Sequence, residues 1–587
     1  MSAPLAVKVT RRLGRRILAW TSGIIGVLLL ACSVAWWYGE TVWSATTVLS
    51  DQQAFADGTF GLELAPLKYI LVAQSISQNA LGPKWQHRFG FLPRDGNATA
   101  CAADAPQNLP VGFGISHRLP GNATPVPVQF VGLTCAACHA AAPAGKVILG
   151  VGSQTADVIG FTDAFLNAVL DPSLSSDKIL AAYDRQCPSE APTGLLGEPN
   201  RWVESFLIGK WLDGARAQAR LNETKYDMPY HGAEIGVSAN IPTGPSRTRP
   251  FRSVVRNTLD LPGAGNVAYS KVPLAAMQGL KSWSQFDGSI GDPVVRSMIA
   301  VFTSGASIEA LDDPEISRNI ERAAAYTLRL GTSPPLPTLA EQFPNLPKPS
   351  TSMLDRGSSV YARYCDTCHG HPDPSGWVMS GPASDHPSIT PLAEIGTDPA
   401  RLAFRYADML PVALASTLPS ADISEQNRKL QTMRDTAAKA QDFAMQDWWS
   451  QAMLRLGDRS REFPAGHRRA FPTADVARRG GYQNAPLPFM WLRAPYLHNA
   501  SVPTLRQLIG LEPRPEKFCR GDAGYDPLAI GVVAPAPDDN GACVTENAAF
   551  LFDTSKPGNS NRGHLYPPPG EVSHDDLEAL LTYLGTL

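Results

Sequence analysis

The chain has 587 residues, a formal net charge of −3 and a hydrophobic fraction of 44%. This length exceeds what one hydrophobic core supports, so about two to four domains are expected. A nearly balanced charge lacks the basic surface that nucleic-acid binding requires, and no nucleic-acid partner is expected.

The N-terminal residues have the composition of a membrane anchor or an export signal. Basic residues cluster at 8–16, before an uncharged stretch at 17–38, and about 20 apolar residues suffice to cross a bilayer. Basic residues on that side hold the N-terminus in the cytoplasm, so the rest of the chain is expected in the periplasm. We expect an uncleaved transmembrane helix within residues 1–40. A cleaved signal, or a lipoprotein signal at Cys32, is the alternative.

The pattern Cys-x-x-Cys-His occurs twice, at residues 135–139 and 365–369. Its thiols lie within one helical turn, where they can add to the two vinyl groups of a haem while the histidine binds the iron. A structural zinc site would need a second Cys/His pair nearby, for which His369-Gly370-His371 is the one indication. A thioredoxin-like pair would need a βαβ context that neither copy has. We therefore expect two covalently attached c-type haems. The expected binding residues are Cys135, Cys138, His139, Cys365, Cys368 and His369.

Four cysteines remain outside these motifs and the N-terminal stretch. An even number in an oxidising compartment suggests two disulfides. Cys519 and Cys543 close a loop rich in Gly, Pro and Asp, and they are the expected pair. Cys101 then pairs with Cys187 by elimination.

The segment at 331–352 is rich in proline. It therefore predicts a linker between two haem domains at 41–340 and 341–587. Pro/Gly-rich flanks around the first motif predict a larger, irregular first domain. The expected fold class is mostly α, with two cytochrome c-like haem domains that carry long irregular insertions, plus the N-terminal transmembrane helix. Because the haems form much of each core, we expect the apoprotein to be poorly folded.

Two helices should enclose the second haem. The first is expected to deliver Cys365 at its C-terminal end. The second is the last helix of the chain, with Ser573 as its cap and two aspartates in its first turn. Its apolar stripe comprises Leu577, Leu580, Leu581 and Leu584.

The sixth ligand of each iron decides the function. An iron with two protein ligands transfers electrons, whereas an iron with an open side can bind dioxygen or peroxide. His498 and His564 have distinctive surroundings among the histidines outside the motifs, and His564 lies on a Gly/Asn-rich loop. Met379, Met409 and Met433 are the methionines considered for the same role.

Four blocks occur in the order seen in one family. They are TCAACH at 134–139, SQFDGSIGDPVVRS at 284–297, APYLHNASVPTLRQL at 494–508 and FDTSKPGNSNRGH at 552–564. In these blocks the chain resembles large exported dihaem c-type cytochromes, whose members include haem-type rubber oxygenases and fatty-acid dioxygenases. That family is in turn similar to the bacterial dihaem cytochrome c peroxidases. The resemblance covers residues 60–587 in scattered blocks.

The resemblance implies a division of labour between the irons. The iron on His139 keeps an open distal side, where dioxygen binds and catalysis occurs. The iron on His369 has a second histidine ligand and supports electron transfer. By this resemblance the second ligand is His564, with His498 as second choice.

Two further points concern the pocket. Trp283 and Phe286 are candidates to line it, although they could equally be core aromatics. Arg249 stands where the peroxidases carry an aspartate in a Gly-Arg-x-Asp-Ala-x-Asn block, which weakens the transfer of active-site roles to that segment.

Three classes of function follow. In the first, a haem-dependent dioxygenase acts on an unsaturated lipid or a polyisoprene-like substrate. In the second, a peroxidase takes electrons from a small redox protein and reduces hydrogen peroxide. The third is a pure electron carrier, which the length of the chain disfavours. We expect an oxidoreductase of the first class, with the peroxidase as the alternative.

Overall fold

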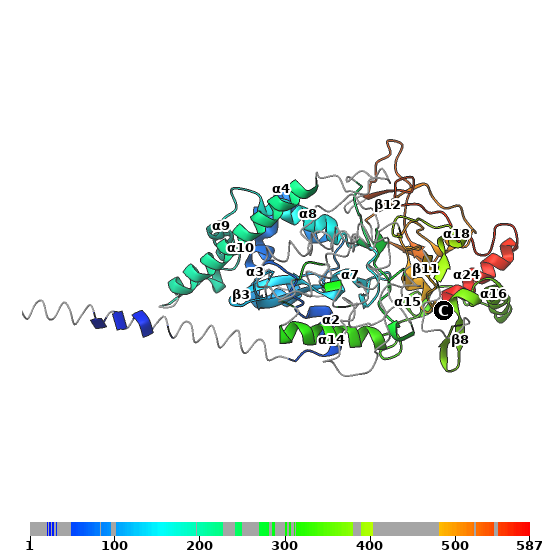
Figure 1. The fold of residues 1–587 in the computed structure, drawn as a ribbon, viewed down its shortest axis with the longest axis horizontal. Coiled ribbons are helices and arrows are strands. Elements are labelled where there is room, and N and C mark those ends of the chain that lie inside the picture. Colours follow the sequence, from blue (N-terminus) through cyan, green and yellow to red (C-terminus); the bar gives the residue numbers. More distant parts are fainter. Residues whose placement is uncertain are drawn as a thin grey trace, which may run out of the picture.

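The computed structural model describes residues 48–82, 84–94, 101–121, 123–194, 197–226, 241–248, 269–280, 285–287, 313–379, 389–402, 481–521, 524–544 and 550–587, with short runs or single residues between 20 and 31 and between 297 and 310. Figure 1 shows an elongated body. Elements from the first half of the chain lie at one end and the C-terminal elements at the other.

An antiparallel sheet with strand order β1-β3-β2 precedes the first motif. Val126, Val128 and Phe130 are buried at every second position of β3. This is the period of two that a half-buried strand requires. That strand ends where helix α7 (Cys135–Cys138) begins, so the sheet fixes the position of the motif. The strands are β1 (Glu63–Pro66), β2 (Phe113–Arg118) and β3 (Pro125–Leu133).

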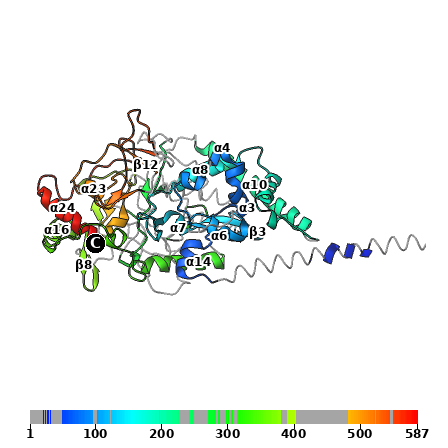
Figure 2. The same cartoon turned by 180° about the vertical axis from the view of Figure 1, so that it is seen from behind.

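Helices cover this sheet and bury an aromatic core that contains no motif residue. Trp85 stacks on Phe161 with ring centres 5.2 Å apart, and Phe113 packs against both rings. These helices lie together at the end of the body opposite the C-terminal helix (Figures 1 and 2). They are α3 (Leu67–Ile76), α8 (Val158–Val169), α9 (Ser176–Gln186) and α10 (Gly197–Tyr226).

A second buried core contains residues from both sides of residue 341, among them Phe55, Ile316, Trp491 and Leu580. Helices α2 (Asp51–Asp57) and α14 (Pro314–Arg329) contribute from the first half. In the segment that the sequence predicts as a linker, Trp491 Nε1 donates a hydrogen bond to the Pro337 carbonyl over 3.1 Å. The two haem motifs are therefore attached to a common core.

The two helices expected around the second haem are confirmed. Helix α16 (Thr351–Tyr364) has Cys365 at its C-cap and leads into α17 (Asp366–His369). Helix α24 (His574–Thr586) begins at Ser573, whose side chain accepts a hydrogen bond from the Asp576 N–H. Helices α16 and α24 lie side by side at one end of the molecule (Figures 1 and 2).

Both expected disulfides are present. Cys101 is bonded to Cys187, and Cys519 is bonded to Cys543. The first ties the segment before β2 to the end of α9, and the second anchors an exposed loop beside β12 (Lys517–Arg520). Both bonds close long loops, which reduces the conformational entropy of the unfolded chain.

Short elements complete the described part of the chain. The helical ones are α4 (Gln78–Leu81), α5 (Trp85–Arg88), α6 (Ala105–Asn108), α15 (Leu339–Gln342), α18 (Leu392–Ile395), α23 (Leu505–Leu508) and the 3₁₀ helices η1 (Ala102–Asp104), η2 (Pro188–Glu190), η4 (Gln278–Leu280) and η6 (Met490–Arg493). The strands are β4 (Ala140–Ala141), β5 (Ile148–Leu149), β6 (Arg247–Thr248), β7 (Ser270–Lys271), β8 (His371–Asp373), β9 (Gly376–Val378), β10 (Ile389–Pro391), β11 (Gly481–Gln483), β13 (Tyr525–Asp526), β14 (Gly531–Val532) and β15 (Phe550–Asp553).

The expected fold class needs correction. Helix accounts for 42% and strand for 14% of the structure, because the segment before the first motif, expected to be irregular, forms a sheet. The predicted transmembrane helix is not supported: within the described residues no helix combines the length and apolarity that a membrane span requires. Most of the stretch at 17–38 lies outside the described residues.

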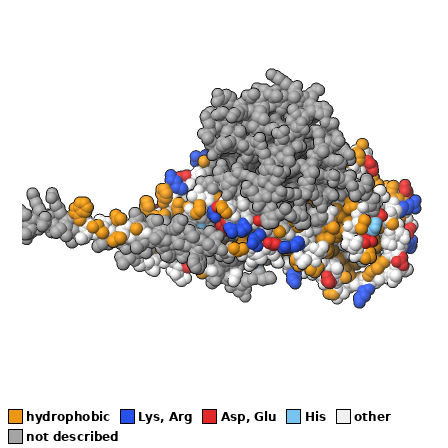
Figure 3. Space-filling view, turned by 60° about the horizontal axis from the view of Figure 1, so that its bottom comes forward, with side chains coloured by type: hydrophobic (Ala, Val, Ile, Leu, Met, Phe, Trp, Pro, Cys, Tyr) orange, Lys and Arg blue, Asp and Glu red, His pale blue; other side chains and the backbone are white. Residues whose placement is uncertain are grey.

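Charged side chains of both signs lie on the surface of the described part. Figure 3 shows a face on which Lys and Arg side chains of the described part are interspersed with Asp and Glu. Mixed charge of this kind produces no extended field of one sign.

Replacement of Gly357 tests the crossing of α16 and α24. A β-carbon at this position would lie 2.2 Å from the Ala579 carbonyl oxygen and 2.7 Å from Cβ of Tyr583. We predict that Gly357→Ala lowers the free energy of unfolding by about 1–3 kcal/mol, as overpacking does. Thermal unfolding of the purified holoprotein measures this loss.

Gly214 in α10 is the matched control, because a β-carbon there would meet nothing within 4 Å. Alanine at an open helical position stabilises by about 0.5–1 kcal/mol relative to glycine. Equal effects of the two substitutions would contradict the proposed close crossing.

Candidate functional site

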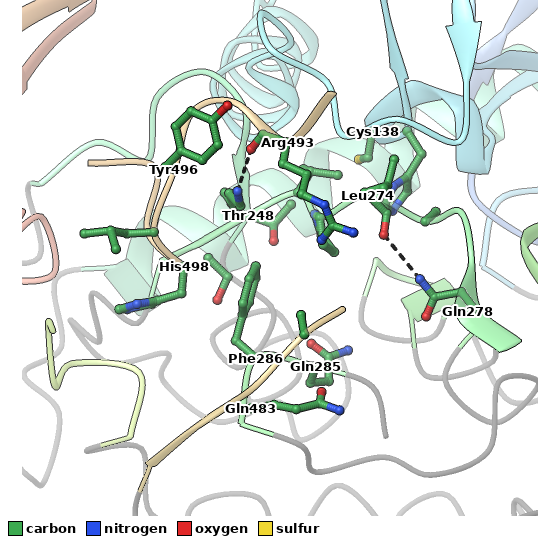
Figure 4. A pocket seen from close by; sticks show the side chains of 18 of the residues that line it. Cys138, Thr248, Leu274, Gln278, Gln285, Phe286, Gln483, Arg493, Tyr496 and His498 are labelled. Carbon is green, nitrogen blue, oxygen red and sulfur yellow. Dashed lines mark hydrogen bonds between the residues drawn. The ribbon is translucent and has the colours of Figure 1, made fainter. Parts of the chain in front are cut away.

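A cavity of about 610 Å³ reaches both Cys-x-x-Cys-His motifs. Its volume lies within the range of about 300–1,000 Å³ that is usual for ligand pockets. Figure 4 shows part of its wall, with Cys138 on one side and His498 on the other. The motif residues that line it are Cys135, Cys138, His139, Cys365, Cys368 and His369.

The first motif is held by backbone contacts on both sides. Gly112 (φ +89°) backs α7 so closely that a β-carbon would lie 2.1 Å from the Ala137 nitrogen. The Cys138 carbonyl accepts a hydrogen bond from the Ser153 N–H over 2.8 Å, and the His139 carbonyl accepts one from the Gly150 N–H over 2.8 Å. These contacts fix the direction in which the motif faces the cavity.

The cavity wall around the first motif is mainly apolar. The His139 ring lies 6.4 Å from the Phe55 ring, between ring centres. Burial raises the pKa of the Cys138 thiol to about 11, whereas a redox-active cysteine has a lowered pKa. The apolar residues of this wall include Phe55, Phe60, Leu62, Leu133, Val158, Ile159, Leu274 and Val301.

The second motif presents its histidine to the cavity in a fixed orientation. His369 Nδ1 lies 2.7 Å from the Ala485 carbonyl oxygen, so Nδ1 carries the proton and Nε2 is left as the potential ligand. Trp377 Nε1 donates to the His369 carbonyl over 2.8 Å. Burial raises the pKa of the Cys365 thiol to about 12, so this thiol, too, is not poised as a redox nucleophile.

The neighbouring histidine that suggested a zinc site has another partner. His371 Nδ1 lies 2.8 Å from Asp366 Oδ1. Among the residues that the structure describes, no group of three or more His, Cys, Asp and Glu side chains could hold a metal ion.

His564 lies opposite His369 across the cavity. The two ring centres are 6.1 Å apart, with an angle of 47° between the ring planes. A metal–imidazole bond is about 2.0–2.1 Å long and the ring centre lies roughly 1 Å beyond the nitrogen, so an iron between two imidazoles sets their centres about 6 Å apart. The separation therefore fits a haem iron between these rings.

Hydrogen bonds to neighbouring segments hold the loop around His564 in place. His564 has φ +49°, and its N–H donates to the Ile395 carbonyl over 2.7 Å. The Arg514 guanidinium donates to the carbonyls of Asn561, Gly563 and His564 over 2.5, 2.8 and 3.2 Å. Figure 1 places α18, whose last residue is Ile395, beside β11 in the C-terminal part of the body.

The ring of His564 is electrostatically suited to a metal. Its Nδ1 is buried and, in the described part of the chain, has no hydrogen-bond partner. Burial, with smaller contributions from His369 and Arg514, lowers the pKa of His564 to about 4. The imidazole is therefore neutral at physiological pH, which is the form that binds a metal.

His498, the second choice as ligand, has different neighbours. Its ring stacks on Tyr482 with centres 4.3 Å apart, and Nε2 lies 3.1 Å from the Tyr482 hydroxyl. Phe286 packs edge-on against the same ring at 6.3 Å. Phe286 thus lines the cavity as expected, whereas Trp283, Arg249, Met409 and Met433 lie outside the described residues.

Sequence reasoning missed Arg493, a buried cation in the cavity wall (Figure 4). Its Nε and Nη2 donate to the Pro488 carbonyl over 3.0 and 2.9 Å, and among the described residues no carboxylate pairs with it. Burial lowers its pKa to about 10, so it remains charged at neutral pH. An arginine inside the apolar run FMWLRAPYL was the available signal.

The residues present fit a covalently attached haem. Such a group needs two thiols and a histidine, an apolar cavity for its ring, and a cation for its carboxylates. The motif residues, the apolar wall and Arg493 provide these features. His564 adds a second neutral imidazole beside His369.

Comparison with protein families gives the class of this region. Residues 481–519 match a family model described as RoxA-like, cytochrome c-like. The match contains β11, Arg493 and His498, which lie in the cavity wall. It supports a relationship to RoxA-like haem cytochromes, and a cytochrome c-like domain implies a covalently attached c-type haem. The class indicated is a haem cytochrome oxidoreductase.

Two curated proteins of Sinorhizobium fredii (strain NBRC 101917 / NGR234) are similar to the chain. Uncharacterized protein y4iJ is 26% identical over 553 residues, which cover 86% of this chain and 85% of that protein. Uncharacterized protein y4iM is 38% identical over 84 residues, which cover 14% of this chain and 19% of that protein.

The buried state of His498 predicts a pH dependence of stability. Burial, together with the charges of Arg401 and Lys271, lowers its pKa from 6.5 to about 3. As the pH falls, the unfolded chain therefore binds a proton at a higher pH than the folded protein does. The stability that the neutral, buried His498 contributes is present above pH 6.5 and is lost as the pH falls toward 3. We predict that His498→Phe, which retains a stacked ring, weakens the loss of stability between pH 7 and pH 4.5.

Denaturant unfolding of the holoprotein at several pH values measures this dependence. His574→Phe is the control, because that side chain is 69% exposed. An unchanged pH dependence in the His498 variant would contradict the prediction.

Proposed function

We propose that this protein is an exported dihaem c-type cytochrome that activates dioxygen at the iron on His139 and oxidises an unsaturated, apolar substrate. An unsaturated lipid or a polyisoprene-like chain is the proposed substrate class. The observation that carries the proposal is the apolar wall of the cavity beside the first motif. Apolar walls exclude water and accommodate hydrocarbon.

The scarcity of carboxylates in the wall favours dioxygen over peroxide. Cleavage of peroxide benefits from a positioned acid and base near the iron. Among the described residues of the wall, Asp163 is the one carboxylate. The RoxA-like family includes haem oxygenases, which also favours dioxygen over peroxide.

Each motif has its own role in this proposal. His369 and His564 are proposed to hold the second iron from both sides, which leaves that iron to transfer electrons rather than to bind a substrate. The 6.1 Å between their ring centres supports this pairing. His139 is proposed to hold the first iron from one side. A small redox protein would supply electrons to the His369 side.

The chain's own residues perform the remaining tasks. When bound, a haem supplies a redox-active iron that can bind dioxygen. The Ala485 carbonyl holds the proton on His369 Nδ1 and keeps Nε2 directed at the cavity. The Arg493 guanidinium in the cavity wall would supply positive charge for the carboxylates of a bound haem. Phe55, Phe60 and their apolar neighbours orient a hydrocarbon chain and keep water away.

Two disulfides support the proposed location outside the cytoplasm. Cys101–Cys187 and Cys519–Cys543 are of the kind that forms and persists in oxidising compartments. Covalent attachment of haem to Cys-x-x-Cys-His also takes place after export. A periplasmic protein is therefore proposed.

Substitution of the proposed ligand tests the assignment of the second iron. We predict that His564→Ala removes a low-spin signal from the electron paramagnetic resonance spectrum of the oxidised holoprotein, because the iron loses an imidazole. His498→Ala is the matched control, since its ring is engaged by Tyr482, and it should retain the signal. Retention of the low-spin signal in the His564 variant would overturn the ligand assignment.

Dioxygen consumption tests the proposed reaction. We predict that the holoprotein consumes dioxygen with an unsaturated fatty acid or an oligoisoprene, and not with the saturated fatty acid of the same length. Hydrogen peroxide reduction driven by a reduced small cytochrome is measured in parallel. Peroxide reduction without substrate-dependent dioxygen consumption would replace the oxygenase by a peroxidase.

A further inference from the structure

Two buried arginines, Arg247 and Arg520, lie beside each other in a cluster that the proposed function does not use. We propose that they bind a small inorganic anion, such as chloride, in a site separate from the haem cavity. The cluster joins β6 and β12 to the loop that follows β5.

Arg247 is 1% exposed, and its hydrogen bonds go to neutral acceptors. Nε donates to the Thr243 carbonyl over 2.6 Å and Nη1 donates to Asn559 Oδ1 over 2.6 Å. Its guanidinium carbon lies 4.9 Å from the Tyr269 ring centre and 4.5 Å from the Phe552 ring centre. Aromatic faces attract the charge but do not neutralise it.

Arg520 is 3% exposed and is less well satisfied. Its Nη2 donates to the Gln154 carbonyl and lies 3.3 Å from Ser246 Oγ. Its Nη1 is buried and, among the described residues, meets no hydrogen-bond acceptor. The Gln154 amide nitrogen is likewise buried without an acceptor in the described part of the chain. Two donors of one cluster therefore lack partners.

No carboxylate compensates for these two charges within the described structure. Asp157 and Asp398 attract Arg247 electrostatically, but among the described residues neither arginine forms an ion pair. Burial lowers the pKa of Arg247 to about 9 and that of Arg520 to about 10, so both remain charged at neutral pH. Buried charges are stable in a protein only when they are paired, and a bound anion provides the missing charge.

The site is distinct from the haem cavity. Neither arginine lines the cavity, whereas Thr248, the next residue of β6, does. A free anion is therefore the expected occupant, and a carboxylate carried by a haem is the other source of the same chemistry.

The anion would also steady the first motif. Gln154 accepts a hydrogen bond from Arg520 through its carbonyl. The preceding residue, Ser153, donates its N–H to the Cys138 carbonyl over 2.8 Å. Charge balance at the arginines is thereby connected to the backbone that carries Cys138.

Halide titration of the holoprotein tests the site. At constant ionic strength, replacement of gluconate by chloride is expected to raise the Tm saturably. Arg520→Met should abolish this shift. Arg506→Met, which removes an arginine paired with Glu578 and Glu512, should retain it. Equal responses of all three proteins, or no saturable response of the parent, would overturn the proposal.

Crystals of the parent holoprotein soaked in bromide give an answer that does not require the Arg520 variant to fold. An anomalous bromide peak beside Arg520 Nη1 is expected. A haem carboxylate at this position, or density for water alone, would overturn the assignment to a free anion. Neither result depends on whether the protein consumes dioxygen.

Discussion

The structure depends on a cavity that the chain's own side chains leave open. At about 24 cal/mol per Å³ of empty volume, a dry cavity of 610 Å³ would cost about 15 kcal/mol. The whole stability of a domain is about 5–15 kcal/mol. A cavity of this size is therefore expected to hold water or a bound group rather than to stay empty. The thiols at its edge supply the means to attach such a group covalently.

The cavity lies where the two halves of the chain meet. Phe55 and Ile316 from one half share a buried core with Trp491 and Leu580 from the other. The cavity passes through this shared core and has one Cys-x-x-Cys-His motif at each side. Its two sides differ chemically. Apolar residues surround His139, whereas histidines, tyrosines and Arg493 line the side of the cavity that contains Tyr482 and His369.

Features set by neighbouring residues could be predicted from the sequence. The Cys-x-x-Cys-His spacing, the cap at Ser573 and the stripe of leucines in α24 are local patterns, and they predicted the ends and faces of two helices. The disulfides followed from counting the remaining cysteines. The β3 strand could also have been predicted, because Val126, Val128 and Phe130 alternate, but the surrounding prolines and glycines suggested an irregular segment.

Features set by distant residues could not be predicted in this way. Tyr482 in β11 and His498, which follows η6 in the chain, meet only in the fold, and no spacing in the sequence indicates their contact. Arg247 and Asn559 are far apart in the chain and meet only in the fold. The choice of His564 came from family resemblance, while its 6.1 Å separation from His369 is a property of the tertiary structure.

The central claim is the proposal that each of the two Cys-x-x-Cys-His motifs carries a covalently attached haem. Mass spectrometry of proteolytic peptides from the purified, exported protein tests it most directly. The account predicts one haem on the peptide that contains Cys135 and Cys138, and a second on the peptide that contains Cys365 and Cys368. A single modified peptide, or two unmodified ones in a protein that retains its activity, would contradict it.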